Sequence, residues 1–193
     1  MTIHFNTPDT SSSTPVIAAW LLKLARLIDS VNTKIGQTLS WLCVLMAITV
    51  GIVVCLRAYG IGSIALQESV TYMHATLFLL CLAYTAKENG HVRVDIWYRK
   101  ASRIKQTWID VFGTILFQLP FAVFISVISW DMVMRSWADG EVSADPGGIP
   151  AVYLLKTLIP IAGALIALHS ISDLIHKTLM LTYTQADETG GKA

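Results

Sequence analysis

Charged residues are scarce in this chain, and long stretches of it contain none. Asp, Glu, Lys and Arg make up 14% of the 193 residues, whereas hydrophobic residues make up 54%. Soluble domains usually carry about 25% charged residues. The mean hydropathy of +0.58 agrees with this deficit. The composition therefore excludes an ordinary soluble domain and predicts an all-α integral membrane protein, because its uncharged apolar runs are long enough to cross a bilayer.

Cysteine is also rare, and its spacing argues against two kinds of site. Cys43, Cys55 and Cys81 all lie inside apolar runs and form no CxxC pair. Isolated cysteines in such runs behave as small hydrophobic side chains. We therefore expect neither disulfides nor metal ligands among them.

Residues 1–15 lack the features of a cleavable signal peptide. The segment MTIHFNTPDTSSSTP has neither a basic start nor an apolar run. Its content of Ser, Thr and Pro predicts a disordered tail. Pro15 suits the first turn of a helix that we expect to follow directly.

Residues 16–34 are apolar along one face only. The apolar positions at helical spacing are Trp20, Leu24, Leu27, Ile28, Val31 and Ile35, and the polar positions between them are Lys23, Arg26, Ser30 and Thr33. This pattern predicts an amphipathic helix that lies in the membrane interface and is too charged to span the bilayer. The alternative is an amphipathic helix that packs on another domain.

Four apolar segments follow, and each is long enough to be a transmembrane helix. Within a four-helix domain of residues 35–180, we expect spans at about residues 35–57, 69–87, 108–137 and 150–177. Pro120 and Pro160 are expected to kink the third and fourth spans. Residues 181–193 are expected to form a loose polar tail.

The basic residues predict the topology of these spans. Of the 14 Lys and Arg residues, eleven fall in the N-terminal segment, the loop between the second and third spans, and the C-terminal region. Only Arg57, Arg135 and Lys156 fall on the other side. Basic residues of short loops are retained in the cytoplasm during insertion. The count therefore predicts that both termini are cytoplasmic.

The loop at residues 87–105 concentrates this charge. It contains six Lys or Arg residues and two acids around an aromatic pair. Aromatic rings beside basic residues suit a segment in the lipid headgroup layer. One interpretation is a plain connector, and the other is a shaped joint whose side chains make defined contacts. The candidate structural or interface residues of this joint are His91, Arg93, Asp95, Trp97, Tyr98 and Arg99.

The span cores lack Asp and Glu, which argues against a transport or catalytic site inside the membrane. His74 and His169 differ in expected depth by about 20 Å at 1.5 Å per residue. One haem cannot bridge that separation. We therefore expect no catalytic, cofactor-binding or metal residues and no enzymatic activity. Two alternatives stay open: a haem-binding membrane anchor and an independent small exporter.

Charged residues near the ends of the last two spans have structural interpretations. Asp131 and Arg135 lie four residues apart and are expected to form a local ion pair. Lys156 can extend to the headgroups or pair with an acid such as Glu68. Small residues, which are common in any helix bundle, give surfaces suited to packing against a partner protein: Gly113, Thr114, Ser126, Ser129, Gly163, Ala164 and Ala167.

Two segments of the chain have a recognisable pattern: AYTAKENGHVRVDIWYRK after the second span and GGIPAVYLLKTLIPIAGALIALHSISDLI in the fourth. They resemble the small membrane subunit of tripartite ATP-independent periplasmic (TRAP) transporters, the DctQ-like proteins. The most specific pieces are HVRVD at residues 91–95 and the run from Leu155-Lys156 to Ile159-Pro160. The likeness covers about residues 20–180.

The resemblance implies a function that spacing alone does not. In that family a periplasmic binding protein delivers an organic acid to a large membrane subunit, which carries the substrate and sodium sites and works by an elevator motion. The small subunit anchors the large one and offers part of the docking surface. The implied protein is thus a scaffold subunit of a sodium-coupled importer in the bacterial inner membrane. The sequence does not name the substrate.

The implied partners follow from this arrangement. The large subunit would be an obligate partner, the binding protein a transient one, and membrane lipids the surroundings, with no nucleic acid and no cofactor. The loop before the fourth span, ADGEVSADPGGIP, contains three acids and no base. Such a loop is either ordinary solvated surface or a site that steers the binding protein. The candidate docking residues are Asp139, Glu141 and Asp145.

Overall fold

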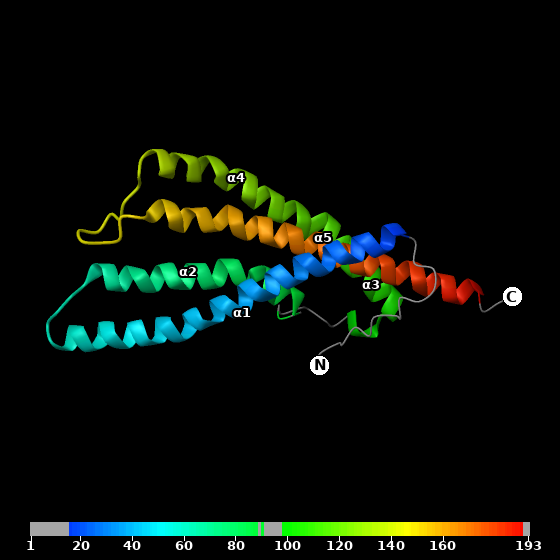
Figure 1. Cartoon of the computed structure of the whole chain (residues 1–193), viewed down its shortest axis with the longest axis horizontal. Helices are drawn as coiled ribbons and strands as arrows, with labels where there is room; N and C mark the ends of the chain where they lie inside the picture. The colour runs from blue at the N-terminus through cyan, green and yellow to red at the C-terminus, as the bar shows by residue number, and fades with distance from the viewer. Residues whose placement is uncertain (1–15, 89, 91–97, 191–193) are drawn as a thin grey trace.

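The structure is a computed structural model that describes residues 16–88, residue 90 and residues 98–190; for Arg99 and residues 183–190 it describes the backbone only. Every regular element in this part of the chain is helical (Figure 1). The α-helices are α1 (Val16–Ala58), α2 (Ile64–Lys87), α3 (Arg103–Gly113), α4 (Leu119–Ala138) and α5 (Val152–Gly190). A 3₁₀ turn, η1 (Tyr98–Lys100), precedes α3, and a π-helical turn, η2 (Thr114–Gln118), joins α3 to α4.

Four helical segments are long and apolar enough to cross a membrane, as the sequence predicts. They are Val16–Ala58, Ile64–Lys87, Arg103–Ala138 and Val152–Thr182. The third segment comprises α3, η2 and α4 without a break. Pro120 has no N–H to donate to a preceding carbonyl, and its ring crowds the turn before it. The π-helical turn ends at Gln118, two residues before this proline, and the kink expected there stays a prediction.

The first helix differs from the expected pair of segments. The expected interfacial helix over residues 16–34 and the first span are both parts of α1, a single helix of 43 residues. No proline interrupts it, and Gly36 lies where α1 contacts α2, with the Tyr84 ring occupying the space of any added Cβ. At 1.5 Å per residue, α1 is about 65 Å long, roughly twice the thickness of a bilayer hydrocarbon core.

The last helix is also longer than expected. α5 continues past Lys177 to Gly190, so residues 181–190 of the expected loose tail have a helical backbone. Residues 1–15 and 191–193 lie outside the described residues, and the prediction of a disordered N-terminal tail falls there.

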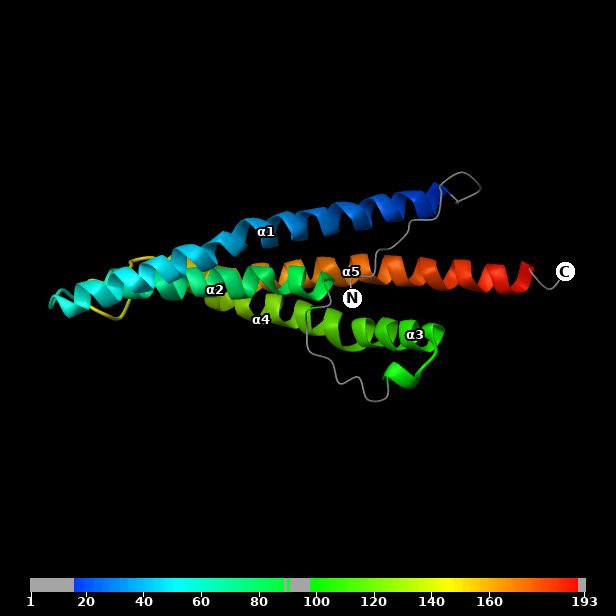
Figure 2. The ribbon, with the colours of Figure 1, turned by 90° about the horizontal axis from the view of Figure 1, so that it is seen from below.

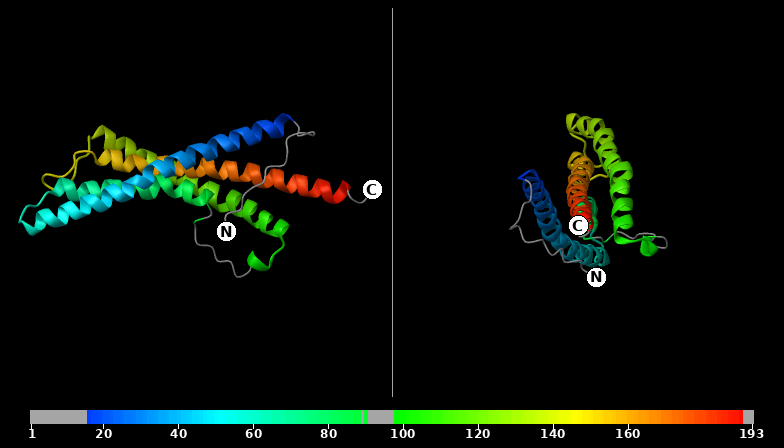
Figure 3. Two further views of the ribbon diagram at one scale, coloured as in Figure 1. Left: turned by 60° about the horizontal axis from the view of Figure 1, so that its bottom comes forward. Right: turned by 90° about the vertical axis from the view of Figure 1, so that its right-hand side faces the viewer.

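The bundle is organised around α5, which contacts α1, α2, α3 and α4. α1 and α2 form an antiparallel pair on one side of α5, and α4 packs on the other side (Figures 1 and 2). Within the described residues, α4 has no extensive contact with α1 or α2. Figure 3 shows the resulting open arrangement from the end. α1 and α4 therefore each keep a large uncovered surface.

Small residues allow α4 and α5 to approach closely. A Cβ on Gly163 would lie 2.8 Å from the Ala122 carbonyl oxygen and would clash with the Ser126 hydroxyl. Ser126 Oγ donates to the carbonyls of Ala122 (2.9 Å) and Pro160 (3.3 Å). Ser126 and Gly163 thus serve the contact between α4 and α5, whereas Ala164 is exposed, and packing of the small residues against a partner stays a prediction.

Candidate functional site

The polar side chains gather in two clusters at different levels of the bundle. The hairpin end contains the α1–α2 turn and the α4–α5 loop, and the start of α1 and the end of α5 point the opposite way (Figure 1). We call the polar residues around the α4–α5 loop the loop cluster: Glu68, Ser136, Glu141, Ser143 and Lys156. The junction cluster lies where α2 ends beside α1, α3 and α5, and consists of Asp29, Thr33, Lys87, Asp110, Thr114, Ser172, Asp173, His176 and Lys177.

Glu141 is the centre of the loop cluster. Its Oε2 atom lies 2.5 Å from Lys156 Nζ and accepts a hydrogen bond of 2.5 Å from Ser136 Oγ. The hydrogen bond from Lys156, followed by that from Ser136, holds the pKa of Glu141 below its usual value. This contact corrects the expected partner of Lys156, which is Glu141 and not Glu68. The reason is the tight turn of the loop, which brings Glu141 back over the start of α5.

Glu68 of α2 binds the same loop from the other side. Its Oε1 atom accepts a hydrogen bond from Ser143 Oγ, and its Oε2 atom accepts one of 2.6 Å from the backbone N–H of Ile149. Gly148 has no room for a side chain, because an added Cβ would meet Ser143 and Glu68 at less than 3 Å. The loop is thereby fastened to α2 as well as to α5.

Trp137 completes the connection between α4 and α5 at this end. Its Nε1 atom donates to Thr157 Oγ1 at 2.9 Å, and its ring centroid lies 4.6 Å from that of Tyr153. An indole with a polar partner at one edge is typical of the membrane interface. This ring therefore marks the level at which the loop cluster leaves the apolar part of the bundle.

Only two of the three candidate docking acids present free carboxylates. Asp139 and Asp145 are exposed, and their carboxylates have no partner among the described residues. Glu141 is occupied by Lys156 and Ser136. The sequence groups these three residues by charge alone, and it does not reveal which of their carboxylates has a partner.

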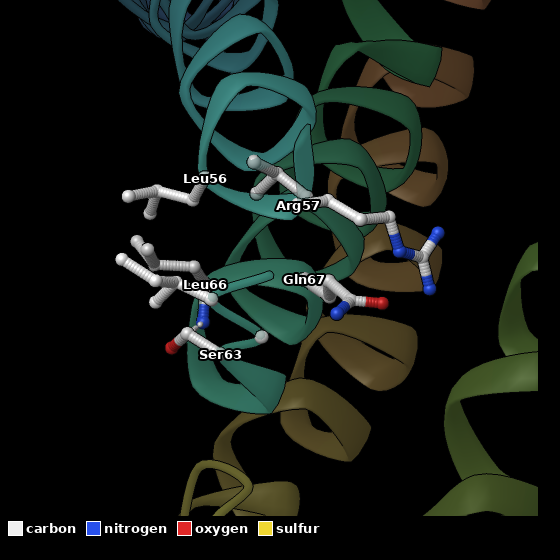
Figure 4. Close-up of a pocket in the computed structure, with 8 residues that line it drawn as sticks. Leu56, Arg57, Ser63, Leu66 and Gln67 are labelled. Carbon is white, nitrogen blue, oxygen red and sulfur yellow. Dashed lines mark hydrogen bonds between the residues drawn. The ribbon is translucent and has the colours of Figure 1, made fainter. Parts of the chain in front are cut away.

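The tip of the α1–α2 hairpin has a crevice with space for little more than a water molecule (Figure 4). Ser63 caps α2 by accepting a hydrogen bond from the Leu66 N–H at 3.4 Å. Leu56 and Leu66 point to one side of the tip, and the polar ends of Arg57 and Gln67 point to the other. This crevice offers no binding site for an organic ligand.

The junction cluster first connects α1 to α5 through Asp29. Its Oδ1 atom accepts a hydrogen bond of 2.8 Å from Ser172 Oγ, and its Oδ2 atom lies 3.2 Å from His176 Nε2. Ser172 is fully buried, and its Oγ atom also lies 3.1 Å from the Ala25 carbonyl oxygen. Next to this contact, Lys87 at the end of α2 donates to Thr33 Oγ1 at 2.6 Å.

The other half of the junction cluster connects α5 to α3. Lys177 Nζ lies 2.7 Å from Asp173 Oδ2 and 3.3 Å from Asp110 Oδ2. Asp110 also accepts a hydrogen bond of 3.0 Å from Tyr98 OH, and Asp173 accepts one of 3.3 Å from Thr114 Oγ1. One lysine of α5 therefore joins two carboxylates from different helices.

Two buried polar side chains lie in the helix contacts close to the junction. His169 of α5 is 7% exposed and Asn32 of α1 is 2% exposed. Neither His169 Nδ1 nor Asn32 Nδ2 has a hydrogen-bond partner among the described residues. His169 is therefore a buried polar side chain at a helix–helix contact that leaves its Nδ1 atom without a described partner.

The two clusters bracket an apolar layer about as thick as a bilayer core. On α2, Glu68 and Lys87 are separated by a rise of about 29 Å, and on α5, Lys156 and Asp173 by about 26 Å, at 1.5 Å per residue. The hydrocarbon core of a bilayer is about 30 Å thick. The ionic groups of the two clusters therefore lie at the depths where headgroups and water can reach them.

The residues of the predicted joint are only partly visible. His91, Arg93, Asp95 and Trp97 lie outside the described residues, and only the backbone of Arg99 is described. Tyr98 is engaged by Asp110. The sequence analysis missed the long-range contacts of Asp29, Asp110 and His176. The only available signal was the spacing of Asp173 and Lys177, four residues apart after a charge-free run.

Asp131 departs from the expected local pairing. Although Arg135 lies one helical turn further along α4, no ion pair joins the two in the described part of the chain. Within the same part, no three His, Cys, Asp or Glu side chains come together as metal ligands would.

Comparison with known proteins assigns the family. Residues 46–179 match the family model of tripartite ATP-independent periplasmic transporters, DctQ component. No curated protein and no solved structure gave a match. The matched region covers more than half of the chain and includes α2, α3, α4 and most of α5. The chain therefore belongs to the DctQ family, as a multi-pass, non-enzymatic small membrane component of a TRAP transporter.

Proposed function

We propose that this protein is a rigid scaffold for the large membrane component of a sodium-coupled importer of an organic acid. The observation that carries the proposal is the division of its surfaces. Polar contacts join three of the four apolar segments at the hairpin end and all four at the junction, whereas the outward faces of α1 and α4 stay apolar and uncovered. A bundle held in this way can support a neighbour without changing its own shape.

The loop cluster and the junction cluster support the role of a scaffold that keeps its shape. The loop cluster joins α2, α4 and α5, and the junction cluster joins α1, α2, α3 and α5. Relative sliding of these helices by one turn would break several charge-assisted hydrogen bonds at the same time. Substrate and sodium binding then belong to the large component, as the family resemblance implies.

We further propose that the hairpin end faces the periplasm and that both termini are cytoplasmic. The basic residues of α1, the 87–105 segment and α5 support this orientation through the positive-inside rule. The first half of α1 would lie obliquely in the cytoplasmic headgroup layer. There the Lys23 ammonium lies 5.2 Å from the centre of the exposed Trp20 ring, which suits a lipid interface.

The same orientation directs the α4–α5 loop toward a periplasmic binding protein. Asp139 and Asp145 are exposed, and Glu68, Glu141 and Lys156 hold the loop between them. A fixed loop with free carboxylates can steer a partner that carries a basic patch, mainly through the encounter rate. In this proposal Glu141 shapes the loop, while Asp139 and Asp145 carry the docking charge.

Reconstitution tests the scaffold function. Proteoliposomes would contain the large component alone, this chain alone, or both. The binding protein would be added outside, and the sodium concentration would be higher outside than inside. We expect uptake of a radiolabelled organic acid only when both membrane components are present, because neither the scaffold nor the unsupported large component completes the cycle. Uptake by this chain alone would overturn the proposal in favour of an independent transporter. Unimpaired uptake by the large component alone would also overturn it.

A further inference from the structure

The face of α4 opposite α5 has a shallow groove lined by apolar side chains and one acid. Its lining residues are Leu119, Pro120, Val123, Phe124, Val127, Ile128 and Asp131. Val127 is 68% exposed and Phe124 is 56% exposed. On a helix of 3.6 residues per turn, Pro120, Phe124, Val127 and Asp131 recur on one stripe. The buried residues Ala122, Ser129, Val133 and Ser136 occupy the opposite stripe, against α5.

Asp131 has no partner in the described part of the chain although it lines this apolar groove. Its carboxylate has no ion pair or hydrogen bond among the described residues. It precedes Ser136 of the loop cluster by five residues, which places it about 8 Å inside the apolar layer. By contrast, every carboxylate of the two clusters accepts a hydrogen bond or takes part in an ion pair.

The chemistry of the groove indicates what covers it. A carboxylate facing lipid chains is unfavourable by roughly 2.5–3.5 kcal/mol near the middle of a span, and less near its ends. A second copy of this chain, packed through the same face about an axis normal to the membrane, would place another Asp131 carboxylate, and no basic residue, at the same depth. A different protein with a basic side chain at that depth avoids both penalties.

We propose that this groove receives a transmembrane helix of the large membrane component, and that this helix presents a Lys or Arg side chain to Asp131. The inference rests on the proposed scaffold function and specifies the face through which it acts. The notch at Pro120, where no side chain projects beyond the ring, gives the incoming helix a place to approach closely. Phe124, Val127 and Ile128 supply the apolar walls.

Photo-crosslinking within the assembled complex tests the face. A photoreactive phenylalanine analogue would replace Phe124 in the groove or, as a matched control, Phe78 on α2, which is 60% exposed. We expect an adduct with the large component from position 124 and little or none from position 78. Adducts of position 124 with lipid only, or with a second copy of this chain, would overturn the proposal. Stronger adducts with the large component from position 78 would do the same.

Charge substitution tests the role of Asp131. Asp131→Asn is expected to raise the dissociation constant of the two membrane components in detergent by about thirtyfold or more, since truncating one partner of a buried charge pair typically weakens binding this strongly. Asp131→Lys is expected to raise it further. Asp139→Lys is the control at an exposed position outside the groove. The melting temperature of the isolated chain should not change with Asp131→Asn, because no contact within the chain is lost. Unchanged affinity of both Asp131 variants would overturn the pairing.

These outcomes are distinct from failure of the scaffold function. If the wild-type chain and the large component do not associate at all, the proposed function fails. If they associate with wild-type affinity in every groove variant and crosslink through another face, the scaffold function stands and the assignment of the groove is wrong.

Discussion

Asp29 is expected to determine whether the first half of α1 stays attached to α5. Asp29→Ala removes the hydrogen bond from Ser172 and the contact with His176. The Ser172 hydroxyl keeps the Ala25 carbonyl as an acceptor, so no buried donor is stranded. The substitution therefore tests the contact itself with little added penalty.

The magnitude follows from the type and exposure of the two contacts. A hydrogen bond to a charged group contributes about 1.5–3 kcal/mol, and hydrogen bonds between membrane helices average about 0.6 kcal/mol. The His176 contact is partly exposed, with 33% of the His side chain accessible, and a pair of that kind contributes at most about 1 kcal/mol. We expect Asp29→Ala to lower the free energy of unfolding by about 1–2 kcal/mol.

Unfolding of the purified protein in mixed micelles, titrated with a denaturing detergent, would measure this change. Ser30→Ala, at the exposed neighbouring position of α1, is the matched control. Hydrogen exchange should also increase in residues 16–34 of the Asp29 variant and stay unchanged in α4. Equal unfolding curves for the two variants would refute the reasoning, since Asp29 would then contribute nothing to the attachment of α1.

Three further substitutions test the packing and the loop cluster. Gly163→Ala should lower the free energy of unfolding by about 1–3 kcal/mol through overpacking against α4. Gly113→Ala should not lower it, because the added Cβ meets nothing within 4 Å. The same detergent titration compares the two variants. The lowered pKa of Glu141 stabilises the fold fully above the ordinary Glu pKa, and this stabilisation should disappear as the pH falls through the lowered value. Melting temperatures across pH should show this loss in the wild type but not in Glu141→Gln. Glu68→Gln should increase proteolysis of the α4–α5 loop, because the amide replaces a carboxylate that holds the loop through two hydrogen bonds; unchanged cleavage would contradict that role.

The number of spans was predictable because each depends on a local property of the sequence. An uncharged run of about 20 apolar residues identifies a candidate span wherever it occurs. The boundaries were less predictable. Nothing at Lys34–Ile35 stops a helix, so a change from amphipathic to apolar sequence was mistaken for a break in α1. The polar residues after Leu181 likewise suggested a loose tail, although they contain no proline and can continue α5.

The contacts of the charged residues were not predictable, because they depend on which elements meet. The sequence offers both Glu68 and Glu141 as partners for Lys156, and only the path of the loop decides between them. Asp29 and His176 are 147 residues apart and meet because α1 packs on α5. Even the near pair Asp131 and Arg135, at ideal helical spacing, does not form. Helical spacing makes a contact possible, and the tertiary structure determines whether that contact forms.

The lengths of α1 and α5 explain why the junction cluster lies where it does. A span needs about 20 residues, and these helices contain 43 and 39. Beyond the junction, α2 has ended, so the first half of α1 keeps only α5 as a helical neighbour. Ala18 and Ala25 are its buried apolar residues there, and two alanine side chains bury little area. Polar contacts through Asp29 must therefore supply much of the attachment within the chain. Under the proposed orientation, the remaining stabilisation comes from the membrane surface, where the exposed apolar stripe around Trp20 and Leu24 is buried among lipids.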